Sequence, residues 1–146
     1  MTPAQARLRA KGPFPDYPFE PKAFAHANGL TQSYLDEGPR DGEVVVMLHG
    51  NPSWSFYWRH LVLGLRDKYR CIVPDHIGMG LSDKPGDDVY EYQLARRVTD
   101  VEALLEHLGV RERAALVVHD WGGMIGMAVA ERRVTRFSRF VVLNTA

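Results

Sequence analysis

Four apolar runs alternate with segments of helical periodicity along the chain, and this alternation limits the fold more than any other feature of the sequence. Each run is continuously apolar, which is typical of a parallel strand buried on both faces. The runs cover residues 44–48, 70–73, 114–118 and 140–143, and the helical segments between them cover residues 58–65, 92–108 and 124–132. The order strand, helix, strand, helix predicts an α/β fold with a doubly wound, mostly parallel sheet.

The first part of the chain does not follow this alternation. Residues 1–21 contain five prolines, and because proline interrupts helices and sheet ladders, we expect an irregular, peripheral N-terminal arm. Residues 24–26 and 31–35 have strand-like patterns on either side of Asn28-Gly29, a turn sequence that predicts a two-stranded hairpin. We therefore predict an arm over residues 1–21 and α/β domain sequence over residues 22–146.

Charge and cysteine content exclude several kinds of partner. The 18 Lys and Arg residues balance the 18 Asp and Glu residues, so the summed charge does not attract nucleic acid or an anionic membrane. The longest charge-free apolar stretch, residues 121–130, is shorter than the roughly 20 residues of a spanning helix. The basic start lacks the apolar region of a secretory signal, and Cys71 has no second cysteine to pair with. These features predict a cytoplasmic protein without a membrane span.

Polar residues follow the apolar runs directly, at the carboxyl ends of the strands, where α/β sheets bind their ligands. Residues 49–52, 74–76 and 119–123 read HGNP, PDH and HDWGG. In the third motif, Asp120 lies between a strand and a helix and is followed closely by Gly122 and Gly123. This layout predicts a nucleophile elbow, a sharp turn that holds one side chain in a strained conformation.

An aspartate at the elbow is suited to alkyl transfer. A serine that attacked an sp³ carbon would end as an ether, which water cleaves poorly, whereas an aspartate ends as an ester whose carbonyl carbon water attacks. The tetrahedral intermediate on Asp120 then needs N–H donors, which we expect from the backbone of Asn51 and Trp121. The side-chain amide of Asn51 and the indole of Trp121 add donors for a departing halide or carboxylate.

Several neighbours are expected to shape the site rather than react. They are His49, Gly50, Pro52, Trp54 and Gly122. Pro52 keeps Asn51 out of the α region, and Trp54 is expected in the pocket wall. Asp75 and His76 are expected to shape their loop. The sequence contains neither a metal-ligand pattern nor a complete dinucleotide fingerprint, so we predict no metal and no cofactor.

Asp120 and His119 each have a second interpretation. Aspartate is common at helix N-caps, so Asp120 alone is also consistent with a capping role. His119 has the chemistry of a base, but strand alternation turns its side chain away from Asp120.

Together, the motifs resemble the haloalkane dehalogenase group of the α/β-hydrolase superfamily. The resemblance rests on residues 49–59 (HGNPSWSFYWR), 74–85 (PDHIGMGLSDKP) and 117–123 (VVHDWGG), and it extends from about Phe24 to Ala146. It implies Asp120 as the nucleophile, Asn51 and Trp121 as the halide site, and a small apolar haloalkane as substrate. The β-lactone decarboxylases of long-chain olefin synthesis are similar too and imply a β-lactone. Epoxide hydrolases share HDWG, but Asn51 disfavours them.

The resemblance also implies elements beyond those in this sequence. Family members carry a helical cap after the sixth strand, and then a catalytic acid and a water-activating histidine. Asn144 occupies the position of the acid in one dehalogenase subgroup, and asparagine cannot serve as that acid. We therefore expect the N-terminal half of a hydrolase, truncated after the sixth strand and without a cap domain, which self-associates through the exposed sheet edge. The alternative is a non-catalytic binding module on the same scaffold.

Overall fold

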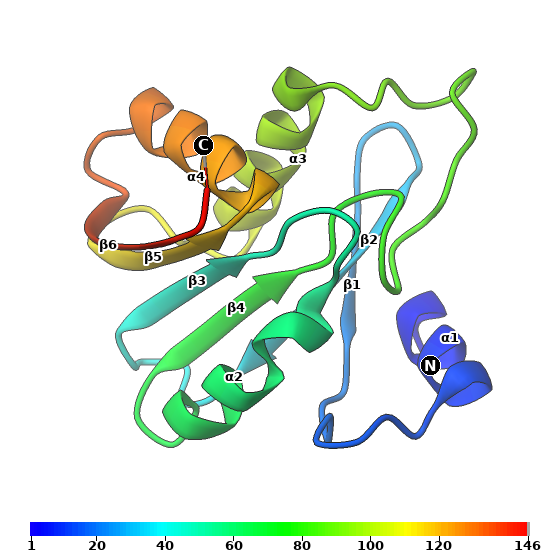
Figure 1. Cartoon of the computed structure of the whole chain (residues 1–146), viewed down its shortest axis with the longest axis horizontal. Coiled ribbons are helices and arrows are strands. Elements are labelled where there is room, and N and C mark those ends of the chain that lie inside the picture. The colour runs from blue at the N-terminus through cyan, green and yellow to red at the C-terminus, as the bar shows by residue number, and fades with distance from the viewer. Residues whose placement is uncertain (146) are drawn as a thin grey trace.

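A six-stranded sheet with helices on both faces organises the computed structural model, which describes residues 1–145 (Figure 1). The strands are β1 (Lys22–Ala25), β2 (Thr31–Glu37), β3 (Val44–Leu48), β4 (Arg70–Pro74), β5 (Ala114–His119) and β6 (Phe137–Leu143). The helices are α1 (Pro3–Lys11), the 3₁₀ helix η1 (Ser55–Trp58), α2 (Arg59–Leu65), α3 (Leu94–His107) and α4 (Trp121–Arg132).

The strand order is β1-β2-β4-β3-β5-β6, and the four neighbouring strands β4, β3, β5 and β6 are parallel. The hairpin of β1 and β2 joins this parallel part through an antiparallel pairing of β2 with β4. The predicted α/β class, the mostly parallel sheet and the hairpin are therefore confirmed. Because β3 lies between β4 and β5 and is parallel to both, the carboxyl ends of these three strands lie at the same edge of the sheet.

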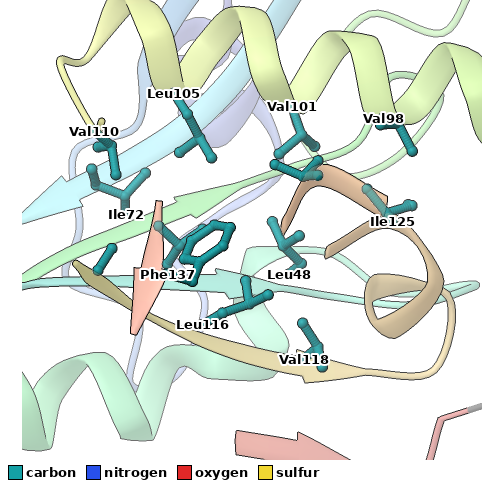
Figure 2. Close-up of a cluster of buried hydrophobic side chains, with 13 residues drawn as sticks. Leu48, Ile72, Val98, Val101, Leu105, Val110, Leu116, Val118, Ile125 and Phe137 are labelled. Atoms are coloured by element: carbon teal, nitrogen blue, oxygen red, sulfur yellow. The ribbon is translucent and has the colours of Figure 1, made fainter. Parts of the chain in front are cut away.

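Both faces of the central strands are buried, which explains their continuous hydrophobicity. On one face, α3 and α4 pack against side chains such as Val46 and Leu48 of β3, and Figure 2 shows this cluster. On the other face, Val45 and Met47 of the same strand pack with Val62 of α2. The two clusters together hold the parallel strands between helices and so fix the position of the strand ends.

The prediction of an irregular arm is wrong for Pro3–Lys11, which form α1. Thr2 and Gln5 build a capping box: the Gln5 N–H donates to Thr2 Oγ1 over 3.1 Å, and the Thr2 N–H donates to Gln5 Oε1 over 2.7 Å. Pro3 occupies the first helical turn, where no intrahelical bond needs its missing N–H. Proline therefore begins this helix instead of preventing it.

The arm is not peripheral either. Tyr17 and Phe19 are only 6% and 3% exposed, and they pack in the same cluster as Val62 and Val45. Arg7 of α1 donates to the Leu81 carbonyl over 2.6 Å and pairs with Asp83. Residues 1–21 therefore pack into the α/β domain instead of lying outside it.

Two other elements begin earlier than the sequence pattern predicts. Helix α4 begins at Trp121 rather than at residue 124, because Gly122 and Gly123 lack the apolar side chains that mark a helix face. Strand β6 begins at Phe137 rather than at residue 140, because Ser138 and Arg139 are exposed polar residues. Among the helices within residues 1–145, none is long and apolar enough to cross a membrane.

Strand β6 pairs with β5 on one side, and we expect its exposed side to cause self-association. Phe140, Val141, Val142 and Leu143 are 42–50% exposed, and an apolar edge strand is a template for pairing with another chain. Size-exclusion chromatography with light scattering is expected to show a mass that rises with concentration. Val142→Lys is expected to reduce this rise, and Val134→Lys, at an 80% exposed position outside β6, is expected to leave it unchanged. A monomer at every concentration would contradict this prediction.

Candidate active site

Asp120 occupies the junction between β5 and α4 in a strained backbone conformation. Its φ is 53° and its ψ is −131°, a combination that residues other than glycine rarely adopt. The carbonyl of Asp120 accepts from the Gly123 N–H over 2.9 Å and from Thr145 Oγ1 over 2.6 Å, and the Asp120 N–H donates to the Asn144 carbonyl over 3.3 Å. Neighbouring segments thus hold the strained residue on both sides.

The side chain of Asp120 does not cap the helix. Asp120 stands at the N-cap position of α4, yet its side chain makes no capping hydrogen bond. The capping interpretation of Asp120 therefore finds no support in the geometry.

Two glycines are required for the elbow to close. A Cβ atom at Gly50 would lie 2.3 Å from the Cβ and the Oδ1 of Asp120. A Cβ atom at Gly122 would lie 2.2 Å from the Leu48 carbonyl oxygen at the end of β3. Any larger residue at either position would push the loop after β3 away from the elbow.

The backbone donors expected from the sequence converge on the Asp120 carboxylate. The Asn51 N–H donates to Asp120 Oδ1 over 2.9 Å, and the backbone N–H of Trp121 also bonds the carboxylate. These two bonds, that of Trp121 first, hold the pKa of Asp120 below its ordinary value, because they stabilise the charged form. Asp120 is therefore ionised at neutral pH, as a nucleophile must be.

His49 and His76 form a buried pair beneath the loop after β3. His49 Nδ1 donates to the Gly50 carbonyl over 2.8 Å, and His49 Nε2 accepts from the His76 N–H over 3.0 Å. The His76 side chain returns a bond from Nε2 to the His49 carbonyl over 2.9 Å. Burial lowers the pKa of His49 to about 4 and that of His76 well below its ordinary value. Both rings are therefore neutral, and they join the ends of β3 and β4.

The rings of His119 and Trp54 both pack against other aromatic rings. The His119 ring stacks on Tyr57 at a centroid distance of 4.7 Å. Trp54 contacts the rings of Phe14, Tyr17 and Phe56, and it lines a cavity of about 350 Å³ beside the arm. Trp54 therefore lines the wall of that cavity, and its place in the substrate pocket stays a prediction.

Asp75 was expected to shape its loop, but its link through Ser55 to Tyr17 has no signal in the sequence. Asp75 is fully buried and accepts from the backbone N–H groups of Ser55 and Leu81 over 2.7 and 2.8 Å. Tyr17 and Ser55 bond through their hydroxyl groups over 2.7 Å. Burial raises the pKa of Asp75, and the backbone donors act against that rise. Within residues 1–145, no three His, Cys, Asp or Glu side chains gather as a metal-binding group.

The sheet and its strained strand-to-helix turn define a class of protein: the chain belongs to the α/β hydrolase fold family, whose model matches residues 43–146. It is 58% identical over 138 residues to a cis-3-alkyl-4-alkyloxetan-2-one decarboxylase of Xanthomonas campestris, covering 91% of this chain and 46% of that protein. It is 40% identical over 129 residues to haloalkane dehalogenase 2 of Mycobacterium bovis, covering 88% of this chain and 43% of that protein.

A solved structure shares the same arrangement. The haloalkane dehalogenase DpaA from Paraglaciecola agarilytica NO2, described as tetrameric, matches with a TM-score of 0.86 and 32% identity over 95% of this chain and 48% of that chain. The resemblance to the dehalogenase group and to the β-lactone decarboxylases is thus confirmed. The chain spans less than half the length of each of these three relatives.

Proposed function

We propose that the protein opens a cis-3-alkyl-4-alkyl β-lactone with Asp120 as nucleophile and releases an alkene and carbon dioxide. The observation that carries this proposal is the Asp120 elbow. Its φ of 53° holds the side chain at the strand end, and the N–H groups of Asn51 and Trp121 keep its carboxylate ionised. A carboxylate held in this way is suited to attack on an sp³ carbon.

The choice of substrate rests on the relatives. Identity to the Xanthomonas oxetanone decarboxylase is 58% and identity to the Mycobacterium dehalogenase is 40%, over nearly the same length. The sequence alone favours haloalkanes first and β-lactones second, and this difference in identity reverses that order.

In the first step, one Asp120 oxygen attacks C4 of the lactone ring. The C4–O bond breaks with inversion at C4, and its electron pair stays on the ring oxygen, which becomes part of a free carboxylate. Relief of ring strain drives the step. The amide of Asn51 and the indole of Trp121 are the proposed donors to this developing anion. The product of the step is an alkyl ester of Asp120.

In the second step, the free carboxylate leaves as carbon dioxide. The electron pair of its C–C bond becomes the new double bond, and the C4–O bond to Asp120 breaks and returns its pair to the Asp120 carboxylate. Inversion followed by anti elimination converts a cis lactone into a cis alkene. No water is consumed, so this route needs no base to activate one.

We expect the chain to convert the cis lactone into the cis alkene without exchanging oxygen at Asp120. The test is incubation in 18O-labelled water, with gas chromatography of the alkene and mass analysis of the peptide that contains Asp120. Water never attacks the ester in the proposed route, so the peptide gains no label. A β-hydroxy acid product with 18O in Asp120 would show ester hydrolysis and would contradict the decarboxylation.

Haloalkane dehalogenation is the second candidate, favoured by the TM-score of 0.86 to a haloalkane dehalogenase. The same attack would release a halide to the donors of Asn51 and Trp121. The resulting ester has no carboxylate to eliminate, so only water removes it. Among residues 1–145 no histidine hydrogen-bonds the Asp120 carboxylate, and we therefore expect the ester to persist. Sustained halide release without lactone conversion would make this candidate the correct one.

A further inference from the structure

We propose that Asp75 is a positioning residue. It holds the loop after β3 in the position from which the Asn51 N–H donates to Asp120. The proposal rests on the proposed role of Asp120 as nucleophile. The Asp75 carboxylate bonds Ser55 and Leu81 rather than Asp120. It acts through Ser55, the residue that ends the loop.

The Asp75 carboxylate joins two loops that lie at the same edge of the sheet. One oxygen accepts from the Ser55 N–H over 2.7 Å, in the loop after β3, and the other accepts from the Leu81 N–H over 2.8 Å, in the loop after β4. The Ser55 side chain also acts against the rise in the pKa of the Asp75 carboxyl group. Asp75 is 0% exposed, so water does not substitute for any of these partners.

The loop from Gly50 to Ser55 is therefore held at both ends. At its start, His49 bonds the Gly50 carbonyl and is itself held by His76. At its end, Ser55 is held by Asp75. Between them, the Ser53 N–H donates to the Gly50 carbonyl over 3.0 Å and closes a tight turn. Asn51 lies within this turn, so its N–H has little freedom to leave Asp120.

The residues around Asp75 leave room for its carboxylate and contact the residue that it bonds. A Cβ atom at Gly80 would lie 2.4 Å from Asp75 Oδ2, so glycine is the residue that leaves room for this oxygen. On the other side, the Tyr17 hydroxyl bonds Ser55 Oγ over 2.7 Å. Ser55 Oγ is thereby linked to the N-terminal arm at the same residue whose backbone N–H bonds Asp75. The N-terminal arm thus continues the support below the loop.

An amide at position 75 would not replace the carboxylate. Both carboxylate oxygens face backbone N–H donors, so Asp75→Asn turns its NH₂ group toward one of these donors and loses that bond. We expect the loop to shift and the Asn51 N–H to withdraw from Asp120. Such a displacement of the Asn51 N–H is expected to lower the reaction rate by roughly 10-fold to 100-fold.

The test compares Asp75→Asn with Asp36→Asn in the full chain. Asp36 is a matched control, because its side chain is only 2% exposed and pairs with Arg70, yet it lies in β2 away from the loop. The first readout is NMR titration of the 13C-labelled Asp120 carboxyl. The second is the rate at which 1,2-dibromoethane alkylates the Asp120 peptide at pH 7.

Asp75→Asn is expected to raise the pKa of Asp120, because the carboxylate loses the Asn51 N–H bond, and to slow alkylation by about 10-fold or more. His119, which also acts on the Asp120 carboxylate, is the same in every variant. Asp36→Asn is expected to change neither value. An unchanged Asp120 pKa in a folded Asp75→Asn protein overturns the positioning role.

If Asp75→Asn does not fold, Ser55→Pro removes the backbone N–H that bonds Asp75, at the first residue of η1, where proline is tolerated. This variant is expected to raise the Asp120 pKa, and no rise overturns the proposal. If the parent chain does not alkylate Asp120, the proposed function fails. The titration still decides the positioning role, because it does not depend on reactivity.

Discussion

Asp120→Asn is expected to abolish ester formation and lactone conversion, with a loss of about 10⁴-fold or more. An amide oxygen is a far weaker nucleophile than a carboxylate, and it cannot form the ester from which the alkene is released. The structural cost is expected to be small, because the amide oxygen still accepts from the Asn51 N–H and asparagine tolerates positive φ better than most residues. The measurement is the rate of lactone loss followed by gas chromatography.

The thermal melt of the same variant serves as the control. A melting temperature close to that of the parent shows that the loss of reaction is chemical rather than structural. If the folded variant keeps more than a tenth of the parent rate, Asp120 is not the nucleophile, and the non-catalytic interpretation of the scaffold becomes the better one.

Gly122→Ala is expected to be the most destabilising single methyl addition at the elbow. Its Cβ would lie 2.2 Å from the Leu48 carbonyl oxygen, a backbone atom that cannot move without distorting β3. We expect a loss of about 3 kcal/mol in the free energy of unfolding, which lowers the melting temperature by roughly 10 °C for a chain of this size. Circular dichroism during heating measures the change.

Gly64→Ala is the matched control for this prediction. Gly64 lies in α2, and a Cβ there meets no atom within 4 Å. Alanine is a better helix former than glycine by about 1 kcal/mol, so this variant is expected to melt slightly higher than the parent. Equal melting temperatures for the two alanine variants would show that α4 does not approach β3 as closely as described.

The central strands could be predicted from the sequence because burial on both faces leaves a direct pattern in it. Strand β3 has the predicted bounds, Val44–Leu48. Helix α1 was missed because the pattern of five prolines outweighed a local signal, the Thr2 and Gln5 capping box, that predicts a helix. The proline spacing was informative for residues 12–21 but not for the helix that precedes them.

The elbow could also be predicted from a local pattern, whereas the contacts that hold the neighbouring loop could not. The sharp turn after β5 could be predicted because Asp120 and Gly122 follow the strand closely in the sequence. Asn51 likewise follows the end of β3 closely. The contacts of Ser55 with Asp75 and with Tyr17 join residues 20 and 38 positions apart in the chain. A hydroxyl in a proline-rich arm carries no local sign that it will reach a loop after a later strand.

Mass mapping of the chain after treatment with an alkyl bromide shows whether Asp120 forms an alkyl ester. We expect a mass gain of one alkyl group per chain, located by peptide mapping on Asp120, and no such gain at this peptide in Asp120→Asn. An unmodified Asp120 in the folded parent chain, with the alkyl group on other side chains or absent, would contradict this expectation.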